Sequence, residues 1–140
     1  MKELALRGRA FPTDLNPAGT VFGGWIMSKM DKAASIAVED IVLSTAVTVS
    51  VSDLHFVKPI RNGDIFSIYT EVLAIGNSSI KIKVDVMVKC KQTREEDHVT
   101  DGVFTFVTIG TNAKPTSVRA VIREDVSEDI KKLLNPIGEK

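Results

Sequence analysis

The segment from Trp25 to Val38 constrains the fold most, because apolar residues cover an unusually large part of the helix that it predicts. The segment contains no Gly or Pro, is rich in Met, Ala and Ile, and follows the pair Gly23-Gly24, so a helix of about fourteen residues is expected. Its polar strip is narrow and consists of Ser28, Lys32, Ser35 and Glu39. The rest of the chain is therefore expected to wrap around this helix on most sides.

Asp31 is the exception on this helix, since it projects at the edge of the apolar face, beside Met27 and Ala34. Carboxylates are rarely buried without a partner. A carboxylate held against an apolar wall can act as a general base or as a nucleophile. Alternatively, Asp31 is half exposed and bonds Ser28 or Ser35 one turn away. The helical pattern alone leaves both interpretations open.

Downstream of the helix, apolar residues recur at every second position, which is typical of β-strands with one core face. Strands are expected over residues 45–57, 65–75, 80–90 and 99–109, residues 3–9 could form a first strand, and a short helix could cover 126–134 with Ser127 near its cap. Short turns between the strands allow antiparallel hairpins. The chain is predicted to be α+β, with one long helix wrapped by a curved antiparallel sheet of about five or six strands.

The strand that begins at Thr45 changes phase along its length, because its apolar residues move from odd to even positions. A bulge or bend near Ser52-Asp53 would keep both sets on the core side. The residues expected to face the core are Val47, Val49, Val51, Leu54 and Phe56. One helix cannot cover so many half-apolar strands, so self-association is expected.

The charges of the chain exclude some partners, since eighteen basic and eighteen acidic residues cancel. No overall field draws the chain to nucleic acid or to an anionic membrane. The sequence contains neither an apolar run long enough to span a bilayer nor an apolar signal region at its start. The single Cys90 allows no internal disulfide, which agrees with a reducing compartment. We therefore predict a cytoplasmic protein without nucleic-acid or membrane partners.

The candidate metal ligands are few, because His55 and His98 are the two histidines of the chain. Neither has a Cys or a carboxylate at a typical metal-ligand spacing, so no metal site is predicted. Cys90 falls in an alternating strand and is expected to be a packed core thiol rather than a nucleophile. His55 is expected to be structural, in a strand that faces the helix.

Two blocks of the sequence, DLNPAG at residues 14–19 and FGGWIMSKMD at residues 22–31, resemble the hotdog-fold acyl-CoA thioesterases, most closely their short bacterial YciA branch. The second block is specific to that family. The likeness continues through FVKPI at 56–60 and GNSSIKIKV at 76–84, and it covers roughly residues 5–110. The resemblance implies a single hotdog domain over 1–140, with a short C-terminal tail or helix from about residue 117.

The resemblance also implies a reaction, the hydrolysis of an acyl-CoA thioester to a free carboxylic acid and coenzyme A, at a site between the subunits of a homodimer. Such dimers often assemble into trimers of dimers. By similarity, Asp31 is the general base or nucleophile and Asn16 faces it from the partner subunit. The backbone amide near Gly24 would polarise the thioester carbonyl. Thr20 departs from the family pattern, in which close relatives commonly carry Asp or Asn at this place.

A neutral protein needs local groups to bind the phosphates of coenzyme A. By resemblance, the turn at 76–79 and Lys58 line the coenzyme A entrance, where backbone amides, hydroxyl groups and ammonium groups can meet the pyrophosphate. The residues implied are Lys58, Gly76, Ser78, Ser79 and Lys81. Coenzyme A belongs to the substrate and product, so no cofactor is predicted.

Two other functions fit the same fold. A non-catalytic acyl-CoA-binding hotdog module would bind the ligand without releasing a thiol. No basic helix-turn-helix is attached here, which argues against a DNA-binding regulator. A dehydratase or hydratase of this fold resembles a pattern in which an Asp and a His cooperate, and neither histidine of this chain lies in such a motif.

Overall fold

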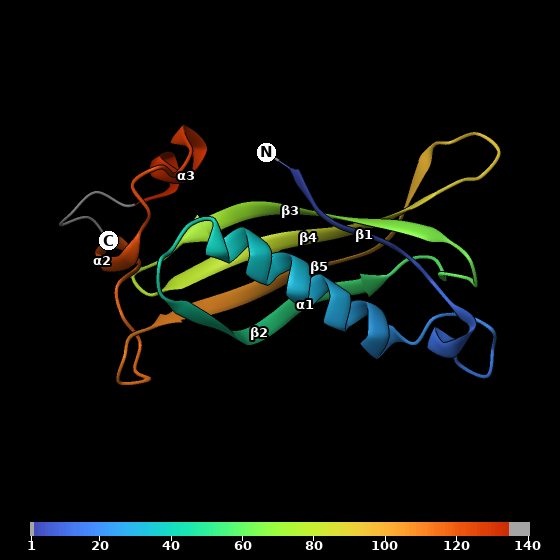
Figure 1. Ribbon diagram of the computed structural model, residues 1–140, viewed down its shortest axis with the longest axis horizontal. Coiled ribbons are helices and arrows are strands. Elements are labelled where there is room, and N and C mark those ends of the chain that lie inside the picture. Colours follow the sequence, from blue (N-terminus) through green and yellow to red (C-terminus); the bar gives the residue numbers. More distant parts are fainter. Residues whose placement is uncertain (1, 135–140) are drawn as a thin grey trace.

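The computed structural model describes residues 2–134 and contains one long helix lying across one face of a curved five-stranded sheet (Figure 1). All neighbouring strands are antiparallel, and their order across the sheet is β1-β3-β4-β5-β2. The predicted hotdog architecture is confirmed. The elements are β1 (Glu3–Arg9), η1 (Pro12–Asp14), α1 (Gly23–Glu39), β2 (Thr45–Phe56), β3 (Ile65–Ile75), β4 (Ser79–Lys89), β5 (Glu96–Ile109), α2 (Val118–Val121) and α3 (Glu128–Leu133).

Helix α1 begins two residues before its predicted start and packs one face against the sheet. Its buried residues are Ile26, Met30, Ala33, Ala34 and Val38, and its predicted polar strip is exposed. The helix is less covered than the sequence suggested, because Ile36 is 42% exposed and Phe22 at the N-cap is 50% exposed. One chain therefore wraps α1 on the sheet side and leaves apolar surface on the other.

Strands β4 and β5 form the centre of the sheet and supply most of its core. Ile80, Ile82, Val84 and Val86 are fully buried on the helix side of β4. Phe104 and Phe106 of β5 are buried too, and β5 lies between β4 and β2.

Strand β2 contains two irregularities, one more than the sequence predicted. The register with β5 shifts between Ser52 and His55, where Asp53 has a φ of 51°, and this confirms the predicted bulge. It also shifts between Thr48 and Ser50. An extra residue in one strand changes which face the side chains on either side of it share. The residues before the first shift therefore point to the face opposite to the predicted one.

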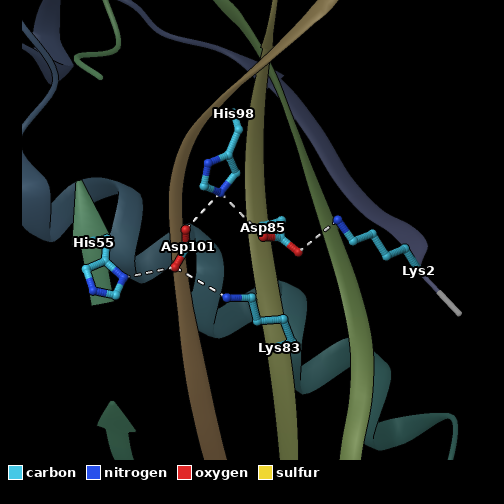
Figure 2. Close-up of polar contacts among 6 residues, drawn as sticks. All are labelled: Lys2, His55, Lys83, Asp85, His98 and Asp101. Carbon is cyan, nitrogen blue, oxygen red and sulfur yellow. Dashed lines mark hydrogen bonds and ion pairs between the residues drawn. The ribbon is translucent and has the colours of Figure 1, made fainter. Parts of the chain in front are cut away.

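The consequences for β2 are opposite in its two halves. Val47 and Val49 are 42% and 55% exposed, so the prediction that they face the core is wrong. Val51 and Leu54 do pack against the core, whereas Phe56 is 53% exposed at the strand end. His55 is also exposed, and its Nδ1 lies 3.2 Å from Asp101 Oδ1 on the outer face of the sheet (Figure 2).

The chain after β5 forms two short helices at one end of the sheet, and the η1 loop lies toward the other end (Figure 1). Ser127 caps α3 by accepting a hydrogen bond from the amide of Ile130 at 3.3 Å, as predicted. Residue 1 and residues 135–140 of the predicted domain lie outside the described residues. Within residues 2–134, no helix is both long and apolar enough to cross a membrane.

Cys90 lies just beyond β4 rather than inside the core, because the strand ends at Lys89. Its thiol is half-buried and donates to Gln92 Oε1 at 3.6 Å. Hydrogen bonds from the side chain and backbone of Thr93 hold the pKa of the thiol below its ordinary value. The predicted core position for this cysteine is wrong.

Candidate active site between α1 and β2

The half-buried Asp31 is oriented across the seam between α1 and β2. Thr48 Oγ1 of β2 donates a hydrogen bond to Asp31 Oδ1 at 2.5 Å. Ser35, which was one of the alternative partners on the helix, donates instead to the carbonyl oxygen of Lys32. The carboxylate is therefore held by a strand residue, and its acceptor capacity is only partly used by that bond.

Thr48 was missed by the sequence analysis because of the unpredicted first shift in β2. In an unbroken alternation Thr48 would share the solvent face with Ser50 and Ser52. The irregularity after Thr48 places its hydroxyl on the helix side. The sequence did contain one indication of such a residue, since a half-buried Asp31 requires a hydrogen-bond donor from the facing strand.

The start of α1 offers backbone donors near a small side chain. The first amides of a helix have no intrahelical partner, and Phe22 at the N-cap makes no side-chain bond to them. A Cβ on Gly23 would lie 3.2 Å from the Phe56 ring, whereas a Cβ on Gly24 would meet nothing within 4 Å. The amide end of the helix at Gly24 is therefore accessible, and its partial positive charge suits a developing oxyanion.

The loop before α1 is held together by Asn16. Its Oδ1 accepts from the amides of Ala18 at 2.9 Å and Thr20 at 3.1 Å, and its Nδ2 donates to Thr20 Oγ1 at 3.1 Å. Gly19 adopts a φ of 83°, which glycine reaches without strain. The side chain of Thr20 thus fixes the amide of Asn16 in an Asx-type turn.

Within one chain, the helix start at Gly24 and the carboxylate of Asp31 cannot both contact the same substrate carbonyl group. Gly24 and Asp31 are seven residues apart on α1, which separates them by about 10 Å along the helix axis. A donor to the carbonyl oxygen and a base for the attacking water both have to lie within about 3 Å of adjoining atoms. The helix start and Asp31 of one chain therefore do not form a complete site by themselves.

The residues predicted to bind coenzyme A are also divided within one chain. Lys58 follows β2, where Phe56 pairs with Thr100 of β5, whereas Ser79 pairs with Val107 of the same strand. Seven residues of extended chain separate the two places by about 23 Å. Lys58 lies 3.7 Å from Asp97 in an exposed ion pair.

The turn at 76–79 is more rigid than a free loop. The Gly76 amide donates to the Ser79 carbonyl oxygen at 2.8 Å, and a Cβ on Gly76 would lie 2.6 Å from Ser79 Oγ. The carbonyl oxygen of Ser78 accepts from the amide of Thr108 at 2.9 Å. Lys81 is exposed one residue beyond Ile80 on the outer face. The turn is therefore fastened to the end of β5.

A second polar cluster lies on the outer face of the sheet, away from α1 (Figure 2). Ligand atoms of Asp85, His98 and Asp101 lie within 4.8 Å of one another. The sequence argument that no carboxylate stands suitably near either histidine is wrong for this group, since Asp101 follows His98 by three residues and Asp85 comes from the neighbouring strand.

Comparison with known proteins identifies the family. Residues 18–94 match the model of the thioesterase superfamily. An uncharacterised acyl-CoA thioester hydrolase of Haemophilus influenzae is 42% identical over 140 residues, which are 98% of this chain and 88% of that protein. The acyl-CoA thioester hydrolase YciA of Salmonella typhimurium is 34% identical over 116 residues, or 81% of this chain and 87% of that protein.

A solved structure shares both the fold and much of the sequence. It is the crystal structure of a hexameric broad specificity acyl-coenzyme A thioesterase, determined for an aspartate-to-alanine mutant. It superposes with a TM-score of 0.82 at 39% identity, and the match covers 94% of each chain.

Proposed function

Because the chain belongs to the thioesterase superfamily, we propose that it is an acyl-CoA thioester hydrolase, which converts acyl-CoA to a free carboxylic acid and coenzyme A. The observation that carries this proposal is the hydrogen bond from Thr48 to Asp31. It fixes one carboxylate oxygen at a seam beside the open edge of β2, and it leaves lone pairs for a water molecule. A site that only bound acyl-CoA would not require an oriented carboxylate.

The proposed reaction uses Asp31 in one of two ways. The carboxylate either removes a proton from a water that attacks the thioester carbon, or attacks that carbon itself to form an anhydride that water then cleaves. The amide of Gly24 stabilises the carbonyl oxygen as it becomes negative, and Asn16 orients the carbonyl or the water. Collapse of the tetrahedral intermediate breaks the carbon–sulfur bond and releases the thiolate of coenzyme A. This scheme needs no cofactor.

The functional unit that we propose is a homodimer formed along the free edge of β2. Within the described residues β2 pairs with β5 on one side only. Val47, Val49 and Val57 leave apolar surface exposed along this strand and just beyond it. An unprotected strand edge of this length is a template for pairing with another chain. A partner on this edge would bring its Gly24 and Asn16 toward Asp31.

Assembly of such dimers into a trimer of dimers is supported by the hexameric thioesterase with the same fold. We propose that the coenzyme A entrance forms where ends of different subunits meet. Lys58 would then come from one chain and the turn of Gly76, Ser78 and Ser79 from another, with Lys81 at the rim. This division accounts for their separation within one chain.

The test of the reaction is the release of coenzyme A thiol from short, medium and long acyl-CoA substrates. We expect turnover by the native protein and its loss, by about 100- to 10,000-fold, in Asp31→Asn. The matched control is Asp40→Asn, since Asp40 is an exposed aspartate at the end of the same helix. Binding of acyl-CoA without thiol release by the native protein would instead indicate a binding module.

The test of the shared site mixes two inactive chains. Asp31→Asn and Asn16→Ala protomers are co-expressed and compared with each variant alone. If each site combines Asp31 of one protomer with Asn16 of its partner, half of the randomly formed dimers contain one intact site, and about a quarter of native turnover returns. If both residues act within one chain, no mixed dimer contains an intact site and turnover stays at the level of the separate variants.

A further inference from the structure

The outer-face cluster begins with two carboxylates in an unfavourable arrangement. Asp85 of β4 and Asp101 of β5 are directly paired across the two strands. Like charges that face each other on one side of a sheet destabilise it. Asp85 is only 5% exposed, so water provides little relief. Cationic groups are therefore expected around the two carboxylates, including the place between them.

His98 occupies that place, with one ring nitrogen directed at both carboxylates (Figure 2). Its Nε2 lies 2.9 Å from Asp101 Oδ2 and 3.4 Å from Asp85 Oδ1. A single N–H points well toward only one acceptor at a time. A proton on His98 is thus a poor bridge for two carboxylate oxygens.

The remaining oxygens of the two carboxylates are bound by other groups. Lys2 Nζ lies 3.3 Å from Asp85 Oδ2. Lys83 Nζ and His55 Nδ1 lie 3.3 Å and 3.2 Å from Asp101 Oδ1. Each carboxylate therefore directs one oxygen at His98 and has the other held from outside. Carboxylates that ligate metals in proteins are typically supported in this way by an outer shell of hydrogen bonds.

The distances from His98 Nε2 to the two inner carboxylate oxygens fit a tetrahedral ion. Bonds of about 2.0–2.1 Å from zinc to imidazole nitrogen and carboxylate oxygen place neighbouring ligand atoms about 3.3 Å apart. The two distances from His98 Nε2 bracket that value. Imidazole with two carboxylates is also a donor set that zinc accepts.

We propose that Asp85, His98 and Asp101 form a zinc-binding site on the outer face of the sheet, with water in the fourth position. Lys2, Lys83 and His55 support the site by holding the oxygens that do not contact the ion. The dication would bridge the two inner carboxylate oxygens and connect β4 with β5, while Lys2 and Lys83 contact the outer oxygens. The site lies on the opposite face of the sheet from Asp31 and is independent of the hydrolysis proposed above.

Calorimetric titration of untagged, chelator-treated protein with zinc ions alone tests the proposal. We expect one ion per chain, loss of binding in His98→Gln, and binding about tenfold weaker in His55→Gln, which alters only an outer hydrogen bond. Cobalt ions should show the visible absorption of a tetrahedral complex. The matched control is Cys90→Ser, because the chain has no other thiol.

Three results would overturn the proposal. They are absence of zinc binding by the native protein, binding that persists unchanged in His98→Gln, and binding that disappears in Cys90→Ser. A circular dichroism melt establishes that His98→Gln is folded at the temperature of titration. If it is not, Asp85→Asn replaces it, since this change keeps the side-chain volume while removing the charged ligand.

Discussion

Asp31 and Asp101 are both half-buried aspartates, but their surroundings differ. Those of Asp31 suit a reactive role, and those of Asp101 suit a structural one. Asp101 contacts His55, Lys83 and His98, so both of its oxygens are occupied. Asp31 has the single hydrogen bond from Thr48 among the described contacts. A carboxylate with unused lone pairs can accept a proton from water, whereas one with several fixed partners mainly stabilises the groups around it.

The same contrast applies to the elements that carry these residues. Asp101 lies in β5, which has a strand on each side, and its partners come from the same chain. Asp31 lies beside β2 at the edge of the sheet, and the groups that would complete its site are about 10 Å away on its own helix. The cluster around Asp101 is thus complete within one chain, whereas our proposal places a second chain beside Asp31.

The largest effect that separates the two aspartates is expected from exchanging each for Asn. Asp31→Asn should lower turnover by about 100- to 10,000-fold and leave the free energy of unfolding nearly unchanged. Asp101→Asn should keep turnover close to native and lower the free energy of unfolding by about 1–3 kcal/mol, because charged hydrogen bonds are lost. Thiol release and urea denaturation measure the two quantities. Equal losses of turnover in both variants would remove the distinction.

A smaller effect is expected at the residue that orients Asp31. Thr48→Val keeps the shape of the side chain and removes its donor, so kcat should fall about 10- to 100-fold with little change in KM. Thr48→Ser retains a hydroxyl and should recover most of the loss. If Val and Ser behave alike in steady-state kinetics, the hydroxyl has no part in positioning the carboxylate.

The smallest effect is expected in the loop before α1. Thr20→Val removes the hydroxyl that accepts from Asn16 Nδ2, so the amide loses one of its constraints. Turnover should fall by about two- to tenfold, the range of one neutral hydrogen bond. Thr20→Ser serves as the control in the same thiol-release measurement. An unaltered rate in Thr20→Val would mean that the backbone of the loop positions Asn16 by itself.

The sequence predicted the central elements well because their burial is strongly periodic. Ile80, Ile82 and Val84 alternate with polar residues, and the apolar face of α1 recurs at helical spacing, so each pattern has one solution that buries its side chains. The resemblance of FGGWIMSKMD placed the helix start and Asp31 in one specific block. These features depend on nearby residues.

The errors lie where local patterns depend on distant partners. Val47 and Val49 were predicted to face the core because they alternate with polar residues in the same phase as Val51, yet a strand at the sheet edge can expose valine. Thr48 faces the helix only because of a register shift against β5, which no pattern within β2 reveals. The cluster of Asp85 and Asp101 depends on pairing between β4 and β5, so the positions of these two residues along the chain did not reveal it.

The first register shift in β2 also suggests how this fold could change its function over evolution. Removing the one extra residue after Thr48 would turn that hydroxyl away from α1 and bring a valine to the seam in its place. Asp31 would then lose its hydrogen bond from Thr48. Deletion of a single codon would therefore remove the orientation on which the proposed hydrolysis depends, while Asp31 itself stays in the sequence.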